Sequence, residues 1–142
     1  MTVQKMLSAK GARVVTAKPL TTLMEIAELL RTERIGVVVI SADGEAVNGI
    51  LSERDIIRAI ADKGASALEL TADQVMTREV VTCDRGDSVG TVMGRMNTGH
   101  FRHLPVIEDG KLCGMISSTD VMGFRLEEVE NEAEHLRSYI SQ

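Results

Sequence analysis

Two serine–aspartate pairs with the same spacing are the residues of this sequence best suited to chemistry. Ser52 stands three positions before Asp55, and Ser117 stands three positions before Asp120. Each serine can cap a helix, and each aspartate favours the positive end of that helix, so capping alone accounts for either pair. The free amides of a helix N-terminus also attract phosphate, and a carboxylate one turn later can accept both hydroxyls of a ribose. Either pair could therefore serve as a structural cap or as a nucleotide contact.

The two pairs belong to a unit that occurs twice in the 142 residues. Gly-Ile-Leu-Ser-Glu-Arg-Asp at 49–55 is matched by Gly-Met-Ile-Ser-Ser-Thr-Asp at 114–120, Val-Val-Thr at 14–16 by Val-Val-Thr at 80–82, and Asp-Gly at 43–44 by Asp-Gly at 109–110. The offset of 66 residues shortens to 65 near the Asp-Gly turn, and loops absorb such changes. Two copies of one unit predict a single pseudo-symmetric domain with paired sites.

Each unit reads as strand, helix, strand, strand, helix, which predicts an α/β (α+β) fold class. In the first unit, a short strand at 14–16 precedes a helix that opens on a capping box, Thr22-x-x-Glu25, and ends near Arg34. The other elements expected in this unit are strands at 37–40 and 47–51, joined by the Asp-Gly turn, and a helix from 52 to about 64.

The second unit repeats this order with weaker local signals. Its first helix, from about Val89, contains Gly90 and Gly94, which each cost roughly 1 kcal/mol relative to alanine, so packing must hold it. Residues 65–74 form a connector too short to separate two domains. We therefore expect a first repeat with the N-terminal segment and linker at 1–76, a second repeat at 77–123 and a C-terminal helix at 124–142.

The C-terminal segment carries a heptad-like apolar stripe. It supports two interpretations: an amphipathic helix folded back on the domain, or a seam along which two chains pair, with glutamates on the other faces. The apolar positions step by four and three residues along Met122, Leu126, Val129, Ala133, Leu136 and Ile140.

Composition narrows the classes of partner. A net charge of −5, a pI near 5.2, one Tyr and two Phe argue against a nucleic-acid surface. Cys83 and Cys113 stand far apart without a CxxC partner and predict neither a zinc site nor a disulfide. Without a secretory segment or an apolar run of roughly 20 residues, the chain is expected to be soluble and cytoplasmic, with no membrane partner.

Motifs of the common catalytic classes are missing from the sequence. There is no nucleophile elbow, phosphate loop, dinucleotide fingerprint or metal-ligand cluster, and no His, Cys or Ser has a convincing catalytic spacing. We therefore expect a protein that is not an enzyme and that holds no metal.

Three features together resemble a known family. Both units end in Gly, two apolar residues, Ser and, three positions later, Asp; residues 35–39 read Ile-Gly-Val-Val-Val; and 101–106 read Phe-Arg-His-Leu-Pro-Val. From about residue 3 to 123 the chain thus resembles a pair of CBS domains, also called a Bateman module. The resemblance implies two tandem β-α-β-β-α repeats that bind AMP, ADP or ATP, and in some members NAD or S-adenosylmethionine, in two clefts between the halves. Such pairs are regulatory and usually catalyse nothing.

The resemblance also implies one richer cleft. There Asp120 holds the ribose, Ser117 and Thr119 bind the phosphate, and Arg102 and His103 supply positive charge. Residues of the first repeat frame the adenine, namely Thr16 and the backbone of Gly36, Val37 and Val38.

The pseudo-symmetric cleft is expected to be the poorer one. Gly36 and Val37 stand where the richer cleft has Arg102 and His103, so this cleft depends on other residues for positive charge. Its expected contacts are Ser52, Arg54, Asp55, Thr82, the backbone near His103 and Leu104, and Lys10 from the opening segment.

These assignments imply a regulatory sensor of energy or redox state. AMP ranks first as its ligand, because few cations surround the richer cleft, and NAD(H), with the same adenylate half, ranks second, beside ATP and ADP. The ligand would rearrange a homodimer that signals to an unknown protein effector. The alternative is a ligand-free module for dimerisation or for adaptor contacts.

Overall fold

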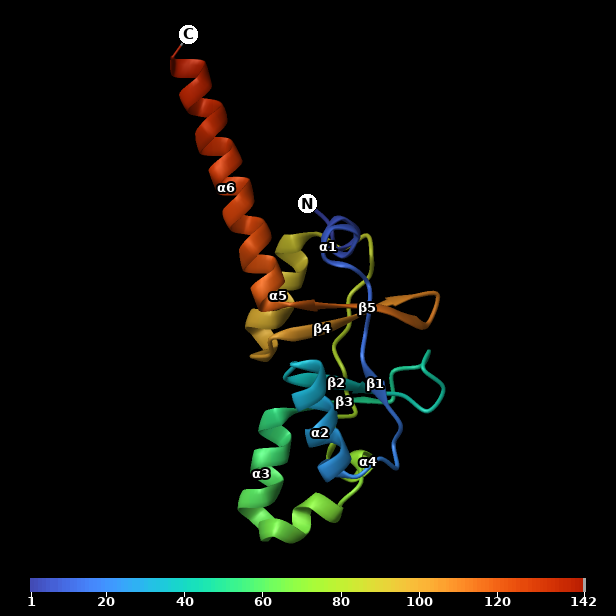
Figure 1. The fold of residues 1–142 in the computed structure, drawn as a ribbon. Coiled ribbons are helices and arrows are strands. Elements are labelled where there is room, and N and C mark those ends of the chain that lie inside the picture. The colour runs from blue at the N-terminus through green and yellow to red at the C-terminus, as the bar shows by residue number, and fades with distance from the viewer. Residues whose placement is uncertain (142) are drawn as a thin grey trace.

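The computed structural model describes residues 1–141, which form two stacked α/β units and a projecting C-terminal helix (Figure 1). This confirms the predicted fold class; of the predicted C-terminal segment 124–142, residue 142 lies outside the described residues. In chain order the elements are α1 (Val3–Lys10), β1 (Thr16–Ala17), α2 (Leu23–Glu33), β2 (Val37–Ile40), β3 (Gly49–Ser52), α3 (Glu53–Lys63), a 3-10 helix (Gly64–Glu69), α4 (Ala72–Val75), α5 (Val89–Gly99), β4 (His103–Glu108), β5 (Lys111–Ser117) and α6 (Ser118–Ile140).

The first repeat builds a small sheet in the order β1-β2-β3. β1 runs parallel to β2 and β3 runs antiparallel to it, so that Val39 lies opposite both Thr16 and Ile50. The strand predicted at 14–16 is displaced to Thr16–Ala17. β3 begins at Gly49, two residues later than predicted, because Asp43 accepts hydrogen bonds from the amides of Glu45 and Ala46 and holds a wider loop.

The second repeat pairs β4 with β5 in the same register. His103 lies opposite Ser117, just as Val37 lies opposite Ser52. Asp109 and Gly110 both have positive φ and form the tight hairpin that their sequence predicts.

The strand predicted at 80–82 does not form, and Pro105 explains why. In the first repeat the amide of Val39 donates to the carbonyl of Val15 at 3.3 Å. The counterpart of Val39 is Pro105, which has no N–H to donate. Pairing is reduced to one parallel bridge between Cys83 and Val106.

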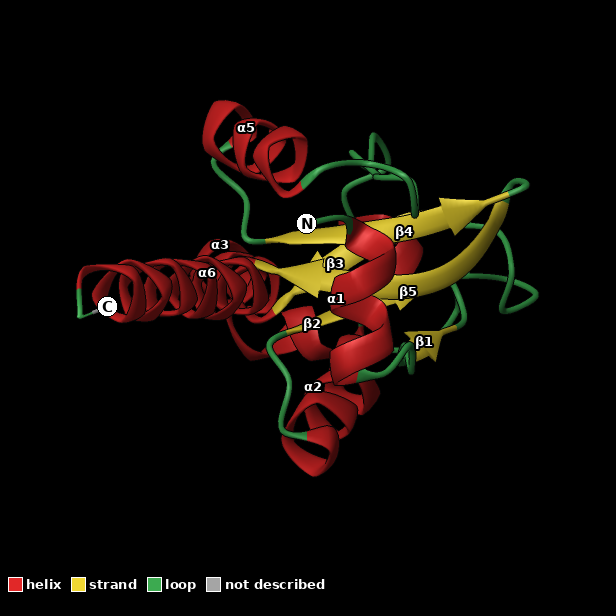
Figure 2. Cartoon of the chain, turned by 90° about the horizontal axis from the view of Figure 1, so that it is seen from above, coloured by secondary structure: helices red, strands yellow, loops and turns green. Residues whose placement is uncertain are grey.

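Helix α1 belongs to the packing of the second repeat, although it opens the chain. It lies over β5 (Figure 2) and places Leu7 on Gly114, where an added Cβ would come within 2.7 Å of the leucine side chain. Met76, just after α4, occupies the same place on Gly49 of the first repeat. The predicted division at residue 76 assigns α1 to the first repeat by its place in the sequence. In space, however, α1 packs on the second repeat.

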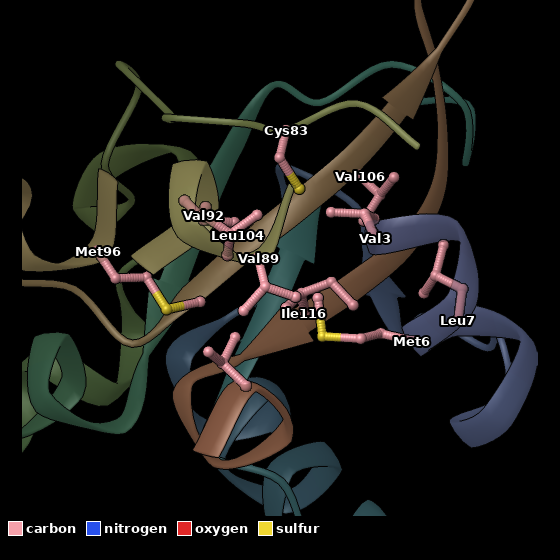
Figure 3. Close-up of a cluster of buried hydrophobic side chains, with 11 residues drawn as sticks. Val3, Met6, Leu7, Cys83, Val89, Val92, Met96, Leu104, Val106 and Ile116 are labelled. Carbon is pink, nitrogen blue, oxygen red and sulfur yellow. The ribbon is translucent and has the colours of Figure 1, made fainter. Parts of the chain in front are cut away.

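Each repeat has its own hydrophobic core. The first core comprises Leu23, Ile26, Leu30, Val38, Ile40, Leu51, Ile56, Ala72 and Met76. The second core is shown in Figure 3 and comprises Val3, Met6, Leu7, Cys83, Val89, Val92, Met96, Leu104, Val106, Ile116 and Val121. Burial raises the pKa of the Cys83 thiol to about 12, so this cysteine is a core residue and not a nucleophile.

The contact between Leu7 and Gly114 leads to a stability prediction. Gly114→Ala should lower the free energy of unfolding by about 1–3 kcal/mol, because the new methyl group overlaps Leu7. Gly94→Ala is the control, since a Cβ there meets nothing within 4 Å and should stabilise α5 by up to about 1 kcal/mol. Urea unfolding measures both changes; a Gly114→Ala variant as stable as the wild type would contradict the close packing of α1.

Helix α6 extends well past the second repeat (Figure 1). Of its residues only Val121 is buried, and five of its six heptad positions are exposed, from 56% at Leu136 to 80% at Ile140, while Ala133 is half-buried. The interpretation in which this helix folds back on its own domain is therefore wrong. Among the helices of residues 1–141, none is both long and apolar enough to cross a membrane.

Candidate ligand-binding cleft between the two repeats

A cavity of about 340 Å³ lies between the two repeats. One wall comes from the segment before β1 and from the link between α2 and β2. The other comes from β4, β5 and the last residue of α1. The lining residues are Lys10, Arg13, Val14, Val15, Arg34, Ile35, Gly36, Val37, His103, Met115 and Ser117.

The serine–aspartate pairs form capping boxes in both repeats, as their spacing predicts. The Asp120 amide donates to Ser117 Oγ at 3.1 Å, and the Ser117 amide donates to Asp120 Oδ2 at 2.9 Å. The matching distances at Ser52 and Asp55 are 3.3 and 2.8 Å. Since Ser117 lines the cavity, this box holds the Asp120 carboxylate beside it.

Among residues 1–141, Asp120 makes one further contact that has no counterpart at Asp55. Lys10 Nζ lies 2.6 Å from Asp120 Oδ2 and donates to the Met115 carbonyl at 2.8 Å. Burial alone would raise the pKa of Asp120, but the hydrogen bonds from Lys10 and Ser117 outweigh it and hold the pKa below its ordinary value. Asp120 is therefore an ionised carboxylate at neutral pH.

His103 faces the same cavity from the start of β4. Burial lowers its pKa, while the Asp120 carboxylate opposes this effect and the positive charges of Lys10 and Arg102 add to it. Without a phosphate beside it, the imidazole is therefore largely neutral at pH 7.

Two arginines that the sequence analysis missed bring positive charge to the cavity wall. Arg13 stands just before the apolar pair Val14-Val15, and its guanidinium lies 3.0 Å from the Glu33 carboxylate. Arg34 ends α2 in the left-handed conformation, with φ of 57°, and lines the cavity. The sequence does contain a signal for both arginines. Arg13 directly precedes the repeated Val-Val-Thr segment, and Arg34 directly precedes the Ile-Gly-Val-Val-Val motif.

Arg102 and Arg54 lie together elsewhere. Both line an open hollow of about 660 Å³ between α5 and α6, whose other walls include Met93, Met122 and Ser118. The Arg102 carbonyl accepts the Ser118 amide at 2.8 Å, so its backbone is tied to the start of α6. Arg102 thus lines this hollow and not the cavity beside Asp120, and its contact with the phosphate stays a prediction.

Several other predicted contacts also lie away from the cavity wall. Thr16 pairs with Val39 in the first sheet, and Val38 is fully buried in the first core. Thr119 is exposed on the first turn of α6, and the Thr82 carbonyl accepts a hydrogen bond from Arg95. The residues that the structure does bring to the cavity, among those predicted for this cleft, are Gly36, Val37, His103 and Ser117, with Asp120 held beside them.

Lys10 requires a correction of its own. The sequence reading placed it in the Asp55 cleft, whereas the structure places it on Asp120. The reason is that α1 packs on the second repeat. Within the described part of the chain, no three His, Cys, Asp or Glu side chains cluster closely enough to hold a metal ion.

The fold and the cleft define an α/β module built from two tandem repeats. Comparison with known families identifies the family to which this module belongs. The family model for the CBS domain matches residues 10–62 and 72–127. The chain belongs to the CBS domain family and contains a pair of these domains. CBS pairs are typically regulatory, and these matches indicate no catalytic family.

Solved structures and curated sequences agree with this assignment. The CBS-domain containing protein ATU1752 from Agrobacterium tumefaciens is 40% identical, with a TM-score of 0.84 over 88% of this chain and 99% of that one. The CBS domain pair of MJ0100, in complex with 5′-methylthioadenosine and S-adenosyl-L-methionine, is 25% identical, with a TM-score of 0.79 over 90% and 98% of the two chains.

Curated relatives are longer than this chain. The mitochondrial CBS domain-containing protein CBSX3 of Arabidopsis thaliana is 31% identical over 123 residues, which cover 84% of this chain and 60% of the relative. The protein MK0525 of Methanopyrus kandleri is 32% identical over 110 residues, which cover 77% and 56%. The chain thus spans little more than half the length of these two relatives.

Proposed function

We propose that the cleft between the repeats binds an adenine nucleotide as a regulatory ligand. The observation that carries this proposal is the Asp120 carboxylate, held at the N-terminus of α6 beside a cavity with walls from both repeats. A carboxylate in this position can accept ribose hydroxyls, and the helix N-terminus favours phosphate. The binding of two adenosine compounds by the MJ0100 pair supports the choice of adenosine.

The cavity suggests a place for each part of the ligand. Val14, Val15 and the backbone of Gly36 and Val37 offer an apolar, close-packed site for the base, in place of Thr16 and Val38. Asp120 would take the ribose, while Ser117 and the exposed Thr119 would lie towards the phosphate. The volume of about 340 Å³ is small for a ligand pocket, so we keep AMP first and rank NAD(H), ATP and ADP after it.

The second cleft, around Ser52, Asp55 and Thr82, is proposed to bind more weakly. Of its two expected cations, Arg54 lines an open hollow with Arg102, and Lys10 lies in the other cleft. We therefore expect one strong nucleotide site per chain.

Signalling is proposed to run from the cleft to α6. A ligand that contacts both repeats favours one relative placement of them, and Asp120 sits in the first turn of α6. The exposed apolar stripe of α6 is proposed to pair with a second copy, so that binding rearranges a homodimer. We also propose that the module senses energy or redox state and that the rearranged dimer signals to an effector protein.

A thermal-shift panel tests the binding proposal. AMP, ADP, ATP, NAD, NADH and S-adenosylmethionine are compared on the purified chain. A ligand at about 100 times its dissociation constant should stabilise the fold by roughly 2.7 kcal/mol, because it binds only the folded state. No shift with any compound would instead favour a ligand-free adaptor that works through α6.

The neutral state of His103 predicts a pH dependence of binding. A phosphate near this buried imidazole should raise its pKa, so the complex takes up a proton and AMP binds more tightly as the pH falls from about 8 to about 7. Below about pH 6 the AMP phosphate itself gains a proton, which limits the useful window. Calorimetry at both pH values measures the effect, and His103→Gln should flatten it; an equal pH dependence in that variant would remove His103 from the phosphate site.

A further inference from the structure

We infer that Lys10 makes the cleft selective for adenosine compounds that carry a 5′-phosphate. This inference rests on the proposed function and adds the chemical class of the ligand. It follows from the way α1 is anchored, from a difference between the two repeats, and from the charges around the cavity.

Helix α1 fixes the backbone of Lys10 at the cleft. Val3, Met6 and Leu7 are buried in the second core, and the Gly11 amide ends the helix by donating to the Leu7 carbonyl at 2.8 Å. The Lys10 side chain lies at the end of this anchored helix and is 32% exposed. Its ammonium can therefore change partners while its backbone stays in place.

The contact between Lys10 and Asp120 distinguishes two sites that are otherwise equivalent in the two repeats. Helices α1 and α4 begin alike, because the Val3 amide donates to the Asp87 carbonyl and the Ala72 amide donates to the Thr21 carbonyl. They end differently: α1 has eight residues and reaches Lys10, whereas α4 has four, and Thr77 then pairs with Ile50. Within residues 1–141, Asp55 consequently accepts hydrogen bonds from Ser52 alone.

Ribose and Lys10 compete for the same carboxylate. Lys10 Nζ occupies Asp120 Oδ2, which a ribose held through both hydroxyls would need. Adenosine must therefore displace the ammonium without offering it another anion. A 5′-phosphate offers that anion close to the ribose, so Lys10 exchanges one ion pair for another.

The basic residues around the cavity also favour an anionic ligand. Arg13 and Arg34 line the cavity with Lys10, and the acidic groups near them are Asp120, Glu33 and Glu53, whose carboxylate packs against Gly36. Once ribose engages Asp120, the freed Lys10 and Arg34 favour an anion and disfavour a cation. Uncharged methylthioadenosine and cationic S-adenosylmethionine, the ligands of the MJ0100 pair, should therefore bind poorly here.

Calorimetric titration of the full chain with adenosine, AMP and S-adenosylmethionine tests this selectivity. The variants are Lys10→Met, the conservative Lys10→Arg, and Lys5→Met, which removes the same charge from an exposed position of the same helix. Wild type and Lys5→Met should bind AMP at least about tenfold more tightly than adenosine. Lys10→Met should weaken AMP about tenfold or more yet tighten adenosine, while Lys10→Arg keeps the preference for AMP.

The outcomes separate the two proposals. Equal losses for AMP and adenosine in Lys10→Met would mean that Lys10 only supports the fold, and unchanged affinities would mean that it contacts neither ligand; each result overturns the inference and leaves the nucleotide site standing. Tighter binding of S-adenosylmethionine than of AMP by the wild type would also overturn it. If no adenosine compound binds the wild type, the proposed function itself fails.

Discussion

Asp120→Ala should weaken AMP binding roughly ten- to hundredfold while the fold persists. The ionised carboxylate is expected to hold the ribose, and hydrogen bonds to a charged group contribute about 1.5–3 kcal/mol, which corresponds to roughly ten- to hundredfold in affinity. Calorimetry on the variant, with circular dichroism to verify folding, measures the effect.

Asp55→Ala is a matched control for this experiment. Asp55 and Asp120 close equivalent capping boxes, so each substitution should cost about 1 kcal/mol of stability through the lost helix cap. Only Asp120→Ala should also remove tight nucleotide binding. If both variants lose AMP equally, or if neither does, the assignment of the strong site to Asp120 is wrong.

Leu126→Glu combined with Val129→Glu should convert a dimer of this chain into monomers. Both side chains lie on the exposed stripe of α6, at 60% and 59% exposure, and pairing with a second copy would bury them. A charge at the centre of an apolar interface weakens association by about a hundredfold or more. Analytical ultracentrifugation measures this change.

Glu127→Gln and Glu130→Gln on the same helix serve as controls for the dimer experiment. They alter charge without touching the apolar stripe and should leave the association unchanged. A wild-type chain that sediments as a monomer, or a double-glutamate variant that stays dimeric, would exclude α6 as the seam.

Local signals accounted for most of the fold. Hydroxyl side chains before the helices, as at Ser52 and Ser117, and β-branched residues in β2 act within a few residues of where they stand. Because the same signals occur in both repeats, each repeat supports the prediction made for the other. The errors occurred where a distant residue decides, as with Pro105, which withholds a ladder hydrogen bond from the segment at 80–82.

The cleft was less predictable than the fold for the same physical reason. The partner of Lys10 is Asp120, and the partner of Leu7 is Gly114, so each contact joins residues more than 100 positions apart. The sequence analysis did not predict α1; the spacing of Val3, Met6 and Leu7 fits one apolar helix face, but it does not say which repeat that face covers. Motif matching likewise assigned Arg102 to the cleft with His103, whereas Arg102 lines the outer hollow and His103 lines the cavity.

A crystal structure of the chain with AMP would show whether Asp120 and Lys10 act as proposed. We expect the base between Val15 and the Gly36–Val37 backbone, ribose hydroxyls within hydrogen-bond distance of the Asp120 carboxylate, and Lys10 moved from Asp120 to the phosphate. AMP bound in the hollow beside Arg54 and Arg102, or bound in the cleft with the Lys10–Asp120 pair intact, would contradict this proposal.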